Sequence, residues 1–197
     1  MADFQAAYNI LAPNEGGYRN ASYDLGGETY RGISRRYWPS WSGWSYIDAD
    51  KSQYGSIPTG KIFTELEPAV MDFYRTNFWN KVQGSQILNQ QLANAVFDFC
   101  VQSGYGPQKI NQALGTGSSN AITSDTLAAL NADPSGAFNK IQAARISYYE
   151  TLNAQGSISD NDIQGILARV KRLASPGALL AAGSGLAIIG ALVFFCS

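Results

Sequence analysis

Three residues near the N-terminus, Glu15, Asp24 and Thr29, have side chains that can transfer a proton or hold a water molecule. They lie in the stretch NEGGYRNASYDLGGETYRGIS, among glycines that permit tight turns. Glycoside hydrolysis needs one carboxylic acid that protonates the leaving oxygen and one carboxylate that activates water. Glu15 follows an apolar helical pattern and suits the acid, whereas Asp24, in a glycine-rich loop, suits the ionised partner. Thr29 can hold the water, although the same composition is also typical of plain turns.

The composition excludes several other classes of chemistry. The 197 residues, enough for one domain of ordinary size, include 14 basic and 15 acidic side chains and no histidine. Without histidine there is no Ser-His-Asp or Cys-His machinery and no His-ligated metal site. Cys100 and Cys196 have neither a zinc-binding spacing nor a placement that indicates a disulfide. Because the net charge is near zero, the chain has no overall basic field that would indicate nucleic-acid binding. We therefore expect no metal, no cofactor and no nucleic-acid partner.

The elements that would position these residues are mostly helical. Residues 3–12 form an amphipathic pattern that ends at Pro13, so Glu15 is predicted at the C-terminal edge of a helix. The glycine-rich residues 16–34 predict a small irregular β-hairpin. An irregular, polar loop is expected at about Ser40 to Gly60. Helical patterns then cover 64–82, 85–104, 106–115, 123–132, 134–155 and 159–173.

Aromatic residues flank the candidate acid–base group. Tyr18, Tyr30 and Trp38 are candidate substrate-binding residues, because aromatic rings pack against the apolar faces of sugars. Trp41 and Trp44 follow closely. Ordinary core packing is the alternative for each ring. Asp98, inside an apolar helical pattern, is expected to cap a loop backbone rather than contact a sugar.

The C-terminal residues have a different character. Residues 177–196 contain no charge and are long enough to cross a bilayer, with Arg169, Lys171 and Arg172 just before them. A transmembrane anchor is predicted there, and a buried core helix is the alternative. Gly183, Ala187 and Gly190 share one helical face, which suggests helix–helix contacts or simply small residues tolerated in an apolar segment. The N-terminus has no signal-peptide pattern.

The run EGGYRNASYDLGGETYRGIS resembles the signature of glycoside hydrolase family 108, lysozymes of phages and bacteria that act on N-acetylmuramic acid linkages. The resemblance implies that Glu15 is the essential general acid, Asp24 the base or stabiliser, and Thr29 the residue that holds water. It extends over about residues 3–172, and about 90–172 resembles the peptidoglycan-binding segment of such chains. Two positions depart from the pattern: Glu28, where a small residue is usual, and Arg31, where lysine is common. Glu28 could replace Asp24 as second carboxylate, or be an exposed turn charge.

The expected fold class is therefore mainly α: a lysozyme-like α+β domain over residues 1–172, with a small β-hairpin, followed by a transmembrane helix within 173–197. The expected function is cleavage of the β-1,4 glycan linkage of peptidoglycan by an N-acetylmuramidase, in phage entry or host lysis. A lytic transglycosylase and a non-catalytic wall-binding or structural protein of a virion membrane are the alternatives. The expected location is a virion membrane or the host inner membrane, because the chain combines the resemblance to a phage-type lysozyme with an anchor and has no signal peptide. The basic residues before the apolar segment favour retention of the preceding domain on the cytoplasmic side.

Overall fold

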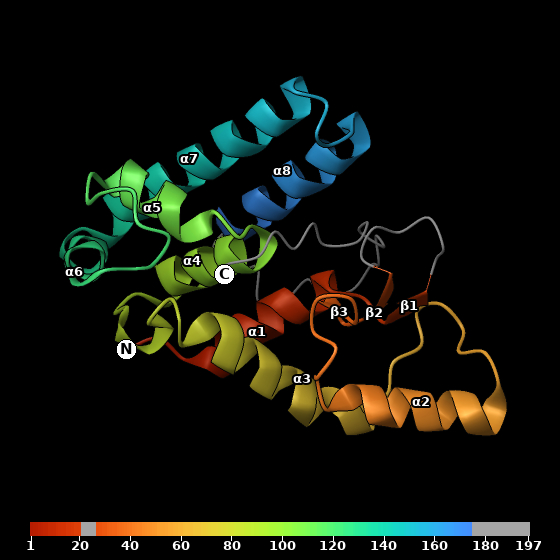
Figure 1. The fold of residues 1–197 in the computed structure, drawn as a ribbon. Coiled ribbons are helices and arrows are strands. Elements are labelled where there is room, and N and C mark those ends of the chain that lie inside the picture. Colours follow the sequence, from red (N-terminus) through yellow and green to blue (C-terminus); the bar gives the residue numbers. More distant parts are fainter. Residues whose placement is uncertain (21–26, 175–197) are drawn as a thin grey trace.

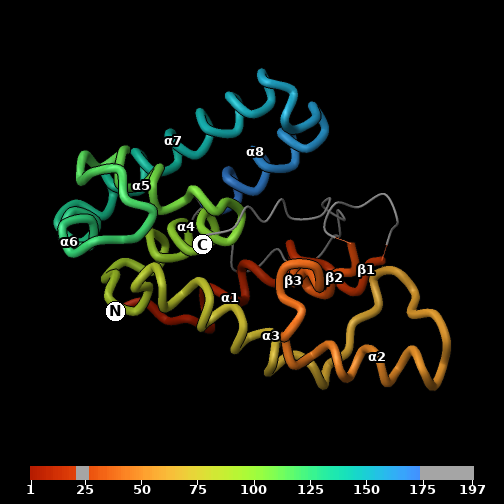
Figure 2. The backbone as a smooth tube through the Cα atoms, in the orientation of Figure 1, coloured from red at the N-terminus to blue at the C-terminus, as the bar shows by residue number. Residues whose placement is uncertain are grey.

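The computed structural model describes residues 1–20 and 27–174. In Figure 1, three short strands and α2 lie together on one side of α1, and α5 to α8 gather on the other side, around α4. Figure 2 shows that the chain passes from the strands through α2 and α3 before it enters α4. The elements are β1 Tyr18–Asn20, β2 Glu28–Tyr30, β3 Ile33–Ser34, α1 Phe4–Leu11, α2 Gly43–Tyr54, α3 Glu67–Tyr74, α4 Gln90–Gln102, α5 Gly106–Leu114, α6 Ser124–Ala132, α7 Pro134–Ala154 and α8 Asp160–Ala174.

The strands form an antiparallel sheet in the order β1-β2-β3, with Tyr18 opposite Tyr30 and Thr29 opposite Ser34. The predicted hairpin is thus present with a third strand added. Arg31 and Gly32, the two residues between β2 and β3, both have positive φ, 49° and 76°. Two-residue hairpin turns need this backbone because its twist matches that of the strands.

Helix α4 is the centre of the helical core. All ten residues from Leu92 to Val101 are buried, because α1, α5, α7 and α8 all pack against it. Three aromatic rings meet edge to face beside α4, with ring centroids 5.5 to 6.0 Å apart. They belong to Phe4 of α1, Phe97 of α4 and Trp79, which lies between α3 and α4. A helix so enclosed positions its polar residues as firmly as its apolar ones. Asp98 is one of them, with 2% of its surface exposed.

The segment expected to be an irregular loop, Ser40 to Gly60, instead contains helix α2. That prediction was wrong because helix α2 buries only two apolar side chains, Trp44 and Ile47, three residues apart. The indole N–H of Trp44 donates to the carbonyl of Trp38 at 2.7 Å, and Trp41 meets Trp44 edge to face. Tertiary packing therefore stabilises a helix whose own pattern is weak.

The helical pattern over 64–82 is interrupted in the structure. Helix α3 ends at Tyr74, and residues 75–79 form a single π-helical turn. This turn places the Trp79 indole against Gly84, where its Nε1 donates to Ser85 Oγ at 2.9 Å. The later helical patterns are confirmed as α4 to α8, with shifts of a few residues at their ends.

Among the helices within residues 1–20 and 27–174, none is both long enough and apolar enough to cross a membrane. The predicted anchor, 177–196, with Gly183, Ala187 and Gly190, lies outside the described residues, and so does Asp24. Cys100 is buried in α4.

Candidate active site

Glu15 lies where helix α1 ends, as the sequence predicted. A 3-10 turn, Ala12–Asn14, continues α1, and the Glu15 N–H donates to the carbonyl of Ala12 at 3.1 Å. Gly16 has φ +64°, which turns the chain toward β1. Gly17 approaches the backbone of Gly60 so closely that no Cβ atom would fit. The glycine pair after Glu15 is therefore required by a sharp turn and a close backbone contact.

Arg31 fixes this loop on both sides of Glu15. Its Nη1 donates to the carbonyls of Ala12 and Gly16, both at 3.4 Å. Its Nη2 pairs with Glu67, whose oxygens lie at 3.0 and 3.2 Å. The arginine therefore links the turn of the sheet, the end of α1 and the start of α3. It holds the backbone of Glu15 in place.

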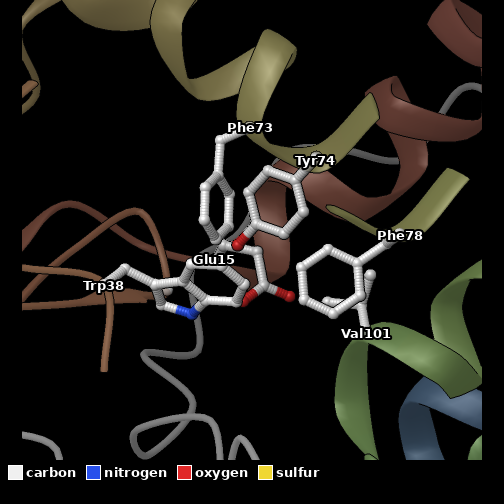
Figure 3. A pocket seen from close by; sticks show the side chains of 7 residues that line it. Glu15, Trp38, Phe73, Tyr74, Phe78 and Val101 are labelled. Carbon is white, nitrogen blue, oxygen red and sulfur yellow. The ribbon is translucent and has the colours of Figure 1, made fainter. Parts of the chain in front are cut away.

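The Glu15 carboxyl group lies in a small pocket with mainly aromatic walls. Figure 3 shows it between Trp38 and Phe78, near the hydroxyl of Tyr74. The cavity volume is only about 10 Å³, close to the space that one water molecule needs and far below the roughly 300 Å³ at which small-molecule sites begin. The pocket therefore admits at most one small group of a larger substrate. Its lining residues are Glu15, Gly32, Trp38, Phe73, Tyr74, Phe78 and Val101.

Burial sets the protonation of Glu15. Only 4% of its side chain is exposed, and this desolvation raises the pKa of the carboxyl above its ordinary value of 4.5. Arg169, 3.1 Å from Oε1, acts in the opposite direction, but Asp98 adds to the increase. The result is a carboxyl that keeps its proton to higher pH than a solvated glutamic acid does. Such a group can donate a proton to a leaving oxygen.

The comparisons with known proteins agree with this chemistry. Residues 8–104 match the family model described as Glycosyl hydrolase 108. The chain is a glycoside hydrolase. The hydrolase is also similar to the solved structure of Brucella abortus SagA, with a TM-score of 0.60 and 25% sequence identity. That similarity covers 92% of this chain and 96% of SagA. No curated protein sequence matches the hydrolase.

The six predicted site residues of the hydrolase do not all come together. Glu15 and Trp38 both line the pocket, and Trp38 meets Phe73 edge to face at 4.9 Å. Thr29 is the central residue of β2, opposite Arg19 and Ser34. Its side chain points to the face of the sheet opposite to that of Tyr30, because successive residues alternate along a strand. Asp24 is outside the described residues.

Tyr18 and Tyr30 are buried, with 3% and 0% of their surfaces exposed. The Tyr30 hydroxyl donates to the carbonyl of Phe63 at 3.0 Å and accepts from its N–H at 2.8 Å. The Tyr18 hydroxyl donates to Glu28 at 2.9 Å. Tyr30 therefore holds the sheet against the backbone of Phe63, whereas Tyr18 links β1 to β2 within the sheet. Neither is among the residues that line the pocket.

Glu28 is not the exposed turn charge that we expected. It lies in β2, its side chain is 12% exposed, and it pairs with Arg35 at 2.7 Å and Lys51 at 2.8 Å. Lys51 lies in α2 and so ties the sheet to that helix, and Arg35 does the same by also pairing with Asp48 of α2 at 2.7 Å. Within residues 1–20 and 27–174, no group of three or more carboxylates and cysteines could hold a metal ion.

The ion pairs behind Glu15 were not among the expectations from the sequence. Asp98, expected to cap a loop, pairs instead with Arg145 of α7 at 2.6 Å and Arg169 of α8 at 2.7 Å. Burial alone would raise the pKa of Asp98, but these two guanidinium groups outweigh it and lower that pKa. A charged residue on the buried face of an apolar helix was the available signal, since such a group needs a partner.

Proposed function

We propose that this hydrolase degrades peptidoglycan as an N-acetylmuramidase, with Glu15 as the general acid. Glu15 would protonate the oxygen of the β-1,4 glycan linkage while water adds to the anomeric carbon. The observation that carries the proposal is the buried Glu15 carboxyl, with its raised pKa, in a pocket with aromatic walls. The match to Glycosyl hydrolase 108 supports it.

The remaining roles follow from the resemblance of the signature. Asp24 would be the carboxylate that activates water or stabilises the positive charge, and Thr29 would hold that water. Trp38 would contact the substrate, because it lies in the pocket wall next to Glu15. Residues 90–172 would contribute to peptidoglycan binding, as part of the same domain.

The test uses the full chain on purified peptidoglycan, with mass spectrometry of the released fragments. We expect reducing-end muropeptides from the wild-type enzyme and none from Glu15→Gln or Asp24→Asn. The matched control is Asp72→Asn, which removes an exposed carboxylate from α3 and should leave activity unchanged. Full activity of Glu15→Gln would refute the proposal.

The fragments also separate the alternatives. Anhydro-muropeptides that are lost with Glu15→Gln but remain with Asp24→Asn would indicate a lytic transglycosylase, in which a hydroxyl of the sugar itself attacks. Folded wild-type protein that sediments with peptidoglycan and releases nothing would indicate a wall-binding protein without catalysis.

We propose further that residues 177–196 anchor the enzyme in a virion membrane or in the host inner membrane, with the helix–helix face of Gly183, Ala187 and Gly190. The support is the uncharged sequence and the basic residues before it. Phage entry or host lysis would be the setting. We expect the full chain to float with liposomes, and a Gly190→Arg/Ala187→Arg variant to remain in the soluble fraction. Flotation of both proteins, or of neither, would contradict the anchor.

A further inference from the structure

Glu15 has two unlike surroundings on its two carboxylate oxygens. Oε1 accepts a hydrogen bond from Arg169 Nη2 at 3.1 Å. Oε2 lies on the side of Gly32 and Tyr74, since a Cβ atom at position 32 would be 2.5 Å from Oε2 and 2.6 Å from the Tyr74 hydroxyl oxygen. Both of these residues line the pocket. One oxygen is therefore held by the helical core, and the other is directed toward the pocket.

Arg169 is itself held more tightly by another carboxylate. Its Nε donates to Oδ1 and Oδ2 of Asp98 at 3.0 and 3.1 Å, and its Nη2 donates to Oδ1 at 2.7 Å. Arg145 of α7 donates a hydrogen bond to Asp98 and another to Gln102. Arg169 is thus shared between two carboxylates, with the closer contacts to Asp98.

Helix α8, which carries Arg169, is tied at its C-terminal end. Gln142 and Gln91 donate to the carbonyls of Val170 and Leu173, each at 3.1 Å. Arg172 donates to the Asn14 side chain, next to Glu15, at 2.9 Å. The match to the hydrolase family ends at residue 104, so Arg145 and Arg169 both lie outside it. The C-terminal helices therefore reach directly to the proposed general acid.

We propose that Arg169 is a positioning residue for Glu15, and that Asp98, held by Arg145, balances the charge of Arg169 so that the Glu15 carboxyl can keep its proton. The inference rests on the proposed role of Glu15 as acid. Arg169 fixes Oε1, which leaves Oε2 as the atom that delivers the proton to the pocket. Without Asp98, the full charge of Arg169 would act on Glu15 and favour the ionised form, which cannot donate.

Stability alone does not account for this arrangement. A buried ion pair contributes little compared with apolar packing of the same volume. Arg145 has no exposed surface, yet its Nε and Nη1 find no hydrogen-bond partner among the described residues. Such unsatisfied groups carry a cost in stability, and functional sites are where such costs are expected.

The pH dependence of the enzyme tests the charge balance. The groups that face Glu15 come from four elements: Arg169 on α8, Asp98 on α4, Tyr74 on α3 and Arg31 in the turn between β2 and β3. The experiment is a measurement of kcat/KM against pH for the full chain on a soluble peptidoglycan fragment. The alkaline limb of this profile reports the pKa of the free enzyme's acid.

The two substitutions should move this limb in opposite directions. Asp98→Asn removes a negative charge near Glu15 and should move the limb to lower pH by about one unit or more. Arg169→Gln removes a positive charge and should move it to higher pH by a similar amount. A loss of packing alone would not give opposite signs. Two shifts in the same direction, or none, would overturn the charge balance.

The geometric part is tested by Arg169→Lys, which keeps the charge but loses the fork that reaches two carboxylates. Its alkaline limb should stay near that of wild type while kcat falls about tenfold or more, because small displacements of a catalytic group are costly. Unchanged kcat would overturn the positioning role. Lys140→Gln is the matched control, since it removes an exposed cation from α7, the helix that carries Arg145, and its profile should equal that of wild type.

Further measurements separate this inference from a folding defect and from the proposed role of Glu15 as general acid. If Asp98→Asn does not fold, the two Arg169 variants decide the question. The titration of the Glu15 carboxyl, followed by infrared difference spectra of each protein against its Glu15→Gln version, should show the same opposite shifts without any substrate. An enzyme that needs no Glu15 for activity but shows these shifts would refute the general acid and keep the charge balance. Activity that requires Glu15, without these opposite shifts, would support the general acid and refute the charge balance.

Discussion

Gly32 leaves room for the Glu15 carboxyl, because any side chain at position 32 would occupy the space between Glu15 Oε2 and the Tyr74 hydroxyl. The residue also has φ +76°, a backbone conformation that glycine adopts without strain. One position in the hairpin turn therefore meets two requirements, one of the sheet and one of the pocket around Glu15.

Gly32→Ala should separate these two requirements. The positive φ costs about 1 kcal/mol of stability with alanine, and the new methyl group should displace Glu15 and lower kcat at least about a hundredfold. Gly55→Ala is the control, because Gly55 has φ +86° and no atom lies within 4 Å of the place that its Cβ would take. It should show the stability loss by chemical denaturation and keep full activity. Equal activity of the two variants would contradict the role of this space.

The raised pKa of Glu15 should also appear in stability. Folding raises this pKa mainly through burial, so the native state binds a proton that the unfolded state releases as the pH increases. The contribution of Glu15 to stability is present below its unfolded pKa and is lost as the pH rises through the folded pKa. The free energy of unfolding of Glu15→Gln relative to wild type should therefore increase from pH 4 to pH 8. Denaturant titrations at several pH values measure it, and a pH-independent difference would count against the raised pKa.

Trp38 should contribute to substrate binding more than to stability. It is partly buried and forms a wall of the pocket, in contact with Phe73. Trp38→Leu should raise KM about fivefold to tenfold, which corresponds to the loss of roughly 1 kcal/mol of aromatic contact, with kcat less affected. Steady-state kinetics on a soluble peptidoglycan fragment provide the readout. An unchanged KM would remove Trp38 from the substrate-binding residues.

Tyr30→Phe should lower stability and leave substrate binding unchanged, in contrast to Trp38→Leu. The substitution removes the hydroxyl that bonds both the carbonyl and the N–H of Phe63 in a fully buried position. The free energy of unfolding should fall by about 1–3 kcal/mol, because these backbone groups lose their partner. KM should equal that of wild type at a temperature where the variant is folded. A raised KM without loss of stability would return Tyr30 to the substrate-binding residues.

The position of Glu15 at the end of α1 could be predicted, because an apolar helical face ends at a proline and a glycine pair. Helix α2 could not, since Trp44 and Ile47 define too short a stripe and the remaining support comes from residues distant in sequence. The same holds for Asp98, whose partners lie 47 and 71 residues further along the chain. Local patterns predict helices, but they do not predict which charges meet inside the core.

The contact between Glu15 and Arg169 joins residues 154 positions apart. During synthesis, the part of the chain that contains Glu15 emerges from the ribosome long before α8 exists. Until then Oε1 of Glu15 has no guanidinium partner from α8, and the charge of Asp98 is not fully balanced. A nascent chain therefore carries the signature of the enzyme before its proposed proton donor is positioned, and on the proposed role of Arg169 full activity requires that α8 has been synthesised and has docked.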